Sequence, residues 1–218
     1  MMHDLQLYTF KLCPYAHRVR LALAEKGQMA EQIEIDLKNK PADFTTLSPH
    51  GRVPLLVHGG LKLWESAVIL EYLDEAFPEH PLMPSQPADR ANARLWIDFA
   101  NSRLFAATHR LIFATDEAIR RELIAEIVEN VRFLEHAAVR RREGGPYLLG
   151  TQFTLADIAL YPWFEQAAAL AHFSAFKIPT DCSGVARWCD AVATRPAVQG
   201  CARSDDWYVE GYQRYLGA

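Results

Sequence analysis

The chain has 218 residues, of which 50% are hydrophobic and 23% charged, and its formal net charge is −4 at pH 7. These values are typical of a globular protein with one large or two small domains, and they exclude a disordered or collagen-like chain. No apolar run approaches the roughly 18 residues of a membrane span. The acidic balance argues against nucleic acid as the main partner, because phosphate binding needs a basic field.

The first 77 residues alternate between strand and helix signals. Pro14 just inside one helix and Gly27 just after it indicate the limits of that helix. Gly59 and Gly60 predict a two-residue hairpin turn. In chain order, the expected elements are a strand at 5–10, a helix at 15–26, a strand at 32–37, an irregular link at 41–48, strands at 53–58 and 61–64, and a helix at 65–77.

This order predicts a thioredoxin-type α/β domain, a mixed sheet with helices on both faces. A crossover helix joins the first two strands, so these strands should be parallel, whereas the hairpin strands must be antiparallel.

A change of pattern follows at residue 78. Four prolines fall within ten residues (78, 81, 84 and 87), which indicates a linker. No strand signal follows, and helical patterns cover 88–113, 116–142, 155–171 and 185–194. The very apolar helix at 155–171 should be central. We therefore expect a thioredoxin-like domain at 1–78, a linker at 79–87 and an all-helical domain at 88–218.

Residues 1–4 lack the basic and then apolar segments of a secretory signal, which favours a cytoplasmic location. None of the four cysteines shows a zinc-binding spacing, so no metal is expected. Cys182, Cys189 and Cys201 are interpreted as small buried hydrophobic residues. Cys13 differs from them because it stands between a strand and a helix.

A cysteine attacks only as the thiolate, and an ordinary cysteine has a pKa of about 8.5. At a helix N-terminus, unpaired N–H groups and the positive end of the dipole stabilise an anion. The position of Cys13 therefore predicts a lowered pKa, to which His17 and Arg18 in the next turn could contribute. A lone cysteine near a helix start is more often structural. The preceding strand, the following proline and the order of elements favour the catalytic interpretation.

The segment 13–16 (CPYA) resembles the dithiol redox motif of glutaredoxins, with Ala16 in place of the second cysteine. A monothiol site cannot resolve its own mixed disulfide and needs an external thiol. Glutathione is the co-substrate that this points to.

Two further features fit a glutathione site. Pro54 at a strand start marks an edge or a special turn, because proline donates no ladder hydrogen bond; the alternative is a simple loop proline. Glu65 and Ser66 at a helix start could receive an ammonium group and a carboxylate, the two groups of a γ-glutamyl end. The alternative there is a helix cap with a first-turn acid.

Over nearly its whole length the chain resembles the cytosolic glutathione S-transferases. The motifs are residues 13–19 (CPYAHRV), 51–54 (GRVP), 63–66 (LWES) and 154–157 (TLAD), in this order. Cysteine at position 13, rather than tyrosine or serine, is similar to the omega, dehydroascorbate-reductase and lambda groups, and residues 38–41 (KNKP) are also omega-like.

The resemblance implies a thioredoxin-like domain plus an all-helical domain, glutathione as co-substrate and a homodimer. It implies that Cys13 forms a mixed disulfide with glutathione, with thiol transferase or reductase activity. Val53 would make main-chain hydrogen bonds to the cysteinyl part, and Pro54 would be cis. Glu65 and Ser66 would hold the γ-glutamyl group.

It further implies that Lys40 pairs with the glycyl carboxylate of glutathione. Thr154 and Asp157 are interpreted as a structural capping box in the helical domain. The acceptor pocket should lie between the domains, over the nucleophile. Its candidate lining residues are Tyr15, Phe105, His109, Trp163 and Trp207, although aromatic residues are more often core than pocket.

Two other functions remain open. One is a non-catalytic interaction or ligand-binding protein with this fold, such as the stringent starvation proteins; these usually lose part of the glutathione site, which this sequence retains. The other is classical conjugation or dehalogenation of electrophiles.

Overall fold

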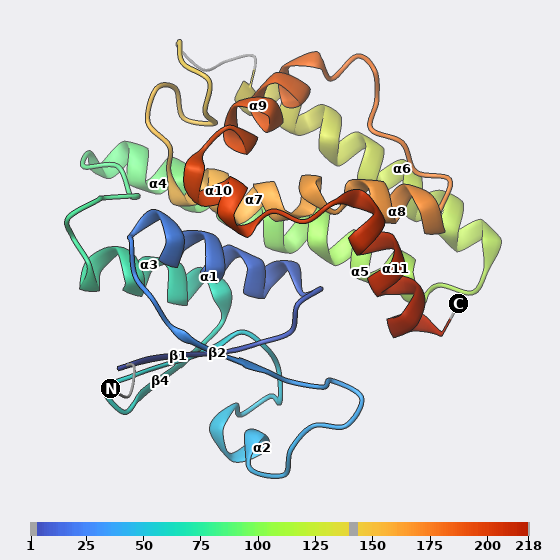
Figure 1. Ribbon diagram of the computed structural model, residues 1–218. Coiled ribbons are helices and arrows are strands. Elements are labelled where there is room, and N and C mark those ends of the chain that lie inside the picture. Colours follow the sequence, from blue (N-terminus) through green and yellow to red (C-terminus); the bar gives the residue numbers. More distant parts are fainter. Residues whose placement is uncertain (1–3, 140–143, 218) are drawn as a thin grey trace. The chain divides into compact units, whose positions relative to one another are not determined.

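The computed structural model describes residues 4–139 and 144–217, which form two units (Figure 1). The N-terminal unit runs to Leu82 and also includes Pro196–Cys201, and the second unit comprises Met83–Arg195 and the residues from Ala202. The last three residues of the helix expected at 116–142 lie outside the described residues.

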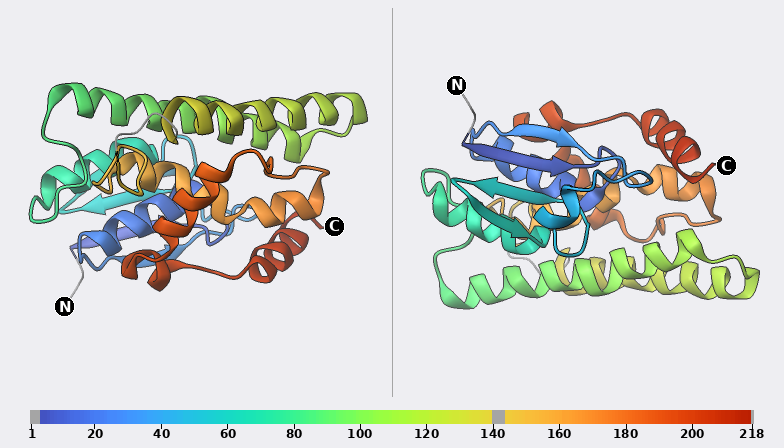
Figure 2. Two further views of the ribbon diagram at one scale, coloured as in Figure 1. Left: turned by 90° about the horizontal axis from the view of Figure 1, so that it is seen from above. Right: turned by 90° about the horizontal axis from the view of Figure 1, so that it is seen from below.

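The N-terminal unit contains a four-stranded mixed sheet. β1 pairs parallel with β2 and antiparallel with β3, and β3 pairs antiparallel with β4, in the order β2-β1-β3-β4. The predicted parallel pair and hairpin are confirmed. Helices α1 and α3 cover one face, and α2 lies on the other (Figures 1 and 2). The bounds are β1 (Leu5–Thr9), α1 (Pro14–Glu25), β2 (Glu31–Glu34), α2 (Phe44–Leu47), β3 (Leu55–His58), β4 (Leu61–Trp64) and α3 (Ser66–Ala76).

The α2 face of the sheet has its own small core. Phe44 of α2 stacks on Tyr8 with ring centroids 5.9 Å apart, and it packs with Ile35 and Leu55. β2 is shorter than expected and ends at Glu34. The reason is Asp36, whose side chain accepts from the N–H of residue 38 and turns the chain.

α1 also packs against a short helix from near the end of the chain, α10 (Pro196–Cys201), which belongs to the same unit. Pro196 starts α10, because its fixed φ suits the first helical position.

The second unit is helical, but its helices are more divided than the periodicity predicts. The π-helical turn η1 separates α4 from α5, and a second one, η2, follows α6. Gln166 separates α7 from α8, and α11 was not predicted at all. Its N-cap is Ser204, whose side chain accepts from the Trp207 N–H. The bounds are α4 (Pro87–Phe99), η1 (Ala100–Phe105), α5 (Ala106–Phe113), α6 (Glu117–Leu134), η2 (Glu135–Val139), α7 (Leu155–Glu165), α8 (Ala167–Phe173), α9 (Ser183–Ala193) and α11 (Asp205–Leu216).

α7 is central to this unit, as predicted, and every residue from Leu155 to Phe164 is buried. The capping box is confirmed: the Asp157 carboxylate accepts from the Thr154 N–H at 2.8 Å. The same carboxylate accepts from the Leu148 N–H and the Trp188 indole, each at 2.8 Å. Asp157 therefore joins α7 to a loop and to α9, which makes its role structural.

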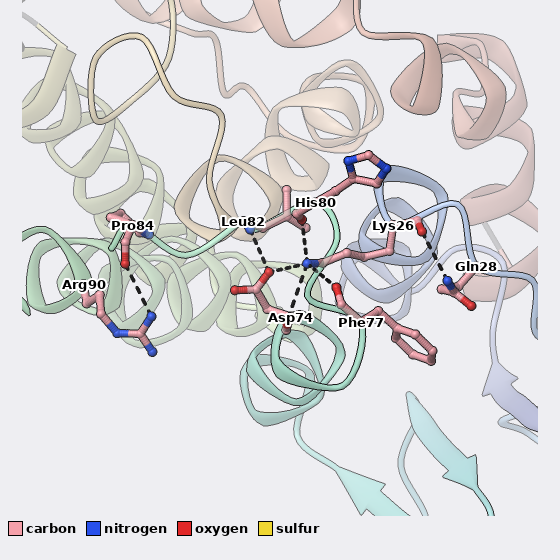
Figure 3. A network of polar contacts seen from close by, with 8 residues as sticks. All are labelled: Lys26, Gln28, Asp74, Phe77, His80, Leu82, Pro84 and Arg90. Atoms are coloured by element: carbon pink, nitrogen blue, oxygen red, sulfur yellow. Dashed lines mark hydrogen bonds and ion pairs between the residues drawn. The ribbon is translucent and has the colours of Figure 1, made fainter. Parts of the chain in front are cut away.

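A buried lysine fixes the chain that leaves α3 (Figure 3). The Lys26 ammonium group, just after α1, pairs with the Asp74 carboxylate and donates to the carbonyl oxygens of Phe77 and His80. The Asp74 carboxylate also accepts from the Leu82 N–H at 2.7 Å. The ends of α1 and α3 and the first part of the expected linker thus share one buried charge pair.

Candidate functional site

Cys13 is the N-cap residue of α1, and Pro14 is the first helical residue. The Cys13 N–H donates to the Phe10 carbonyl at 2.9 Å, which sets the turn between β1 and α1. The residue is partly exposed. Its sulfur lies 3.8 Å from the Val53 carbonyl oxygen, so a protonated thiol can donate there. The nucleophile candidate and the head of the hairpin are therefore in contact.

The net pKa shift of Cys13 is opposite to the sequence-based prediction. Burial of the sulfur raises the pKa of the Cys13 thiol above its ordinary value. The N–H groups of Ala16 and Tyr15 and the charges of Arg20 and Arg18 lower the pKa, but burial outweighs them. The helix N-terminus acts in the predicted direction. The error was to ignore desolvation, which a sequence does not report.

The Val53–Pro54 peptide bond is cis, as expected. The loop before it is closed by buried Ser48, whose hydroxyl donates to the Arg52 carbonyl at 2.9 Å and accepts from the Arg52 N–H at 3.1 Å.

Lys40 reaches back to this loop. Gly51 has φ +56°, and a Cβ added there would lie 3.6 Å from the Lys40 ammonium nitrogen. Lys40 is exposed. Its charge is therefore held beside the loop that leads to Val53, where it can meet an anionic group.

Glu65 and Ser66 start α3, as predicted. Glu65 is exposed and has φ +67°, a left-handed conformation that is uncommon for residues other than glycine and is found at functional sites. Ser66 is buried, and its hydroxyl accepts from the Arg18 guanidinium at 3.1 Å. Arg18 thus connects α1, which begins at the nucleophile candidate, to the start of α3.

The contacts of Arg18 could not be predicted from the sequence, which indicated only a possible effect of its charge on Cys13. Arg18 is fully buried, and burial lowers the pKa of its guanidinium to about 10. The guanidinium lies 5.0 Å from the centre of the Tyr15 ring. Tyr15 is close enough to Cys13 and Glu65 for their charges to act on its hydroxyl, and burial raises the pKa of Tyr15. Only the chain spacing from residue 13 offered a signal for Arg18.

The other acceptor-pocket candidates lie on four elements of the second unit. Phe105 in η1 and Trp163 in α7 are buried, and the Trp163 indole donates to the Thr108 hydroxyl at 2.8 Å. His109 on α5 is exposed and packs on a neighbouring phenylalanine. Trp207 on α11 is half-buried. Phe105 and Trp163 therefore pack as core residues.

Within residues 4–139 and 144–217, no group of three or more His, Cys, Asp or Glu side chains is arranged to hold a metal ion. Among the helices in the same ranges, none combines the length and the apolar character that crossing a membrane requires.

Comparisons with known proteins place the chain in a family. The family model described as glutathione S-transferase, N-terminal domain, matches residues 7–81, and that of the C-terminal domain matches residues 116–191. Glutathione S-transferase U22 of Arabidopsis thaliana is 34% identical over 179 residues, which are 80% of each chain.

Two solved structures share the whole fold. Glutathione transferase Omega 3C of Trametes versicolor has a TM-score of 0.83 and 33% identity, covering 98% of this chain and 90% of its own. Rice GST1, solved in complex with glutathione, has a TM-score of 0.86 and 28% identity and covers 100% of both chains. With its thioredoxin-like sheet, its helical unit and these matches, the chain belongs to the glutathione S-transferase family.

Proposed function

We propose that this protein is a cysteine-type, omega-like glutathione transferase that works as a thiol transferase or reductase, including reduction of acceptors of the dehydroascorbate kind. The observation that carries the proposal is a partly exposed cysteine at the start of α1, whose sulfur is in contact with the residue before a cis proline. The similar omega transferase of Trametes versicolor supports the same class.

Glutathione would lie along the N-terminal unit. Val53 would bind the cysteinyl part through its main chain beside Pro54. Glu65 and Ser66 would hold the γ-glutamyl ammonium and carboxylate, and Lys40 would pair with the glycyl carboxylate. All of these residues belong to one unit. The charges of Lys40 and Glu65 are opposite to those of the groups they would bind, as charge complementarity requires.

The reaction would run in two exchanges. The Cys13 thiolate attacks the glutathione sulfur of a mixed disulfide between glutathione and an acceptor thiol. A bond forms between Cys13 and glutathione, and the acceptor leaves as its thiolate. A second glutathione thiolate then attacks the glutathione sulfur bound to Cys13, which releases oxidised glutathione and restores the Cys13 thiolate.

The raised pKa of Cys13 sets the pH dependence of this chemistry but does not prevent it. Each unit of increase lowers the thiolate fraction at neutral pH about tenfold. Thiolate nucleophilicity rises with pKa at a Brønsted slope of roughly 0.4–0.5, so about threefold of each tenfold loss is recovered. The rate should therefore rise with pH through neutrality.

We also propose the domain roles that this function needs. Residues 1–78 would form the glutathione-binding domain, residues 79–87 the linker, and residues 88–218 the domain that contributes the acceptor pocket. The protein would act as a cytoplasmic homodimer, with a small electrophilic or disulfide acceptor as its second substrate.

A second candidate function is conjugation of glutathione to electrophiles. It is favoured by the raised pKa of Cys13 and by the contact from its sulfur to the Val53 carbonyl. A cysteine that stays protonated can donate to a bound glutathione thiolate instead of attacking. Comparing a chlorinated aromatic with a mixed disulfide as substrates separates the two functions.

Mass spectrometry of the intact protein tests the main proposal. After incubation with oxidised glutathione, we expect a gain of one glutathionyl group that maps to Cys13. Reduced glutathione should remove it. Absence of the adduct, or an adduct confined to Cys182, Cys189 or Cys201, would contradict the mechanism.

Replacing Glu65 by alanine tests the glutathione site. Because the exposed carboxylate would lose its ion pair with the γ-glutamyl ammonium, we expect weaker retention on immobilised glutathione, by about tenfold or more. Glu79→Ala, at an exposed acid in the same unit beyond α3, is the control and should be retained normally. Equal retention of Glu65→Ala would mean that Glu65 does not contact glutathione.

A further inference from the structure

Arg20, in the second turn of α1, reaches back to the segment that precedes the nucleophile candidate. One terminal nitrogen of its guanidinium donates to the Thr9 hydroxyl at 2.7 Å, and the other donates to the Lys11 carbonyl at 3.1 Å. Thr9 ends β1 and is buried. One planar side chain thus joins α1 to both the last strand residue and the connecting segment, residues 10–12.

The connecting segment is held from three further directions. The Lys11 N–H donates to the Glu34 carboxylate at 2.8 Å, the Ile35 N–H donates to the Thr9 carbonyl at 2.8 Å, and the Cys13 N–H donates to the Phe10 carbonyl at 2.9 Å. These bonds come from the main chain or from β2. Arg20 adds two hydrogen bonds from a side chain of α1. The position of the Cys13 sulfur depends on this segment, because residues 10–12 join β1 to the start of α1.

The charge of Arg20 also acts on the sulfur. Among the charged groups that lower the pKa of Cys13, Arg20 acts more strongly than Arg18. Arg18 is fully buried, and its guanidinium binds Ser66. Arg20 is partly exposed, so its charge is retained at every working pH.

The other ionisable groups near the site belong to several elements. On α1 they include Tyr15 and Arg18, which interact electrostatically with Cys13. They also include the buried His17, whose main-chain N–H donates to the Cys13 carbonyl at 3.0 Å. From the hairpin side, Arg52 and Glu65 act on the Tyr15 hydroxyl. From β2, Glu34 faces the connecting segment through the Lys11 N–H.

We infer that Arg20 is a positioning residue for Cys13: its guanidinium fixes the segment 10–12 and keeps a permanent positive charge near the nucleophile. This inference deepens the proposed function, since it assigns the group that aligns and activates the attacking sulfur. A lysine would keep the charge but would lose the two diverging hydrogen bonds of the guanidinium.

The test is the pH dependence of Cys13 alkylation by iodoacetamide, followed on the Cys13 peptide by mass spectrometry. In the wild-type protein the midpoint should lie above that of an ordinary cysteine, because burial dominates. In Arg20→Gln the midpoint should move higher and the rate at pH 7 should fall about 2- to 3-fold. The high-pH plateau should rise slightly, because a more basic thiolate is more nucleophilic. Arg20→Lys should keep a midpoint close to that of the wild type.

Amide hydrogen exchange of residues 10–13 tests the positioning role. Exchange should be faster in both Arg20→Gln and Arg20→Lys. In Thr9→Val, which removes one acceptor and keeps the charge, exchange should also be faster while the alkylation midpoint stays unchanged. Arg187→Gln, at an exposed arginine of α9, should change neither measurement.

An unchanged midpoint in Arg20→Gln, or unchanged exchange in both Arg20 variants, would overturn the inference. If Arg20→Gln does not fold, the effect of the Arg20 charge is tested in the wild-type protein by adding salt. Alkylation of Cys13 at pH 7 should slow with rising salt, because a partly exposed charge is screened. An alkylation rate that does not depend on salt would overturn the inference. The experiment uses no glutathione, so its failure is distinguishable from failure of the proposed thiol transfer.

Discussion

Replacing Cys13 by serine is expected to abolish thiol transfer, with a loss of roughly 10³-fold or more. A hydroxyl of the same shape cannot form the disulfide with glutathione that both exchanges require. The measurement is the rate of reduction of a glutathionylated acceptor by glutathione. The fold should be retained, because a serine hydroxyl can make the same contacts as the sulfur, to the Val53 carbonyl and to the N–H groups of Tyr15 and Ala16.

The same variant separates the two candidate functions. A serine hydroxyl can donate to a glutathione thiolate, so conjugating activity toward a chlorinated aromatic should be retained or should appear. Cys189→Ser is the matched control, since that thiol lies on α9 in the helical unit. Full thiol transferase activity in Cys13→Ser would show that the proposed mechanism is wrong.

Replacing Lys26 by methionine is expected to destabilise the protein by about 3–5 kcal/mol, because the Asp74 carboxylate would remain buried without its cation. The carbonyl groups of Phe77 and His80 would lose a donor at the same time. For a chain of this length the midpoint of thermal unfolding should fall by about 10 °C. Differential scanning calorimetry or circular dichroism measures this change.

Two variants make this prediction specific. The double variant Lys26→Met with Asp74→Leu removes both charges and should recover part of the lost stability. Arg132→Met breaks exposed ion pairs with Glu129 and Asp181 and should leave the unfolding midpoint nearly unchanged, because water screens exposed charges. A loss in Lys26→Met no larger than that in Arg132→Met would mean that the buried pair contributes little.

The order of the N-terminal elements, their parallel and antiparallel pairing and the Thr154–Asp157 capping box could all be predicted from the sequence. The sequence also placed Cys13 at a helix start. These features follow from local signals, since alternation, helical period, proline and glycine positions and cap residues act over a few neighbouring residues. The interruptions of the long helices and the helix α11 were not predicted, because a helical period does not specify where tertiary packing inserts a π turn or a break.

The electrostatics of the site depend on how the chain folds. The pKa of Cys13 rises because the fold removes the sulfur from water, and that desolvation exceeds the helix N-terminal effect that the sequence predicted. Likewise, the contacts from Arg18 to Ser66 and from Lys26 to Asp74 each join residues 48 positions apart. Burial and approach between distant segments are properties of the folded chain, so no local pattern encodes them.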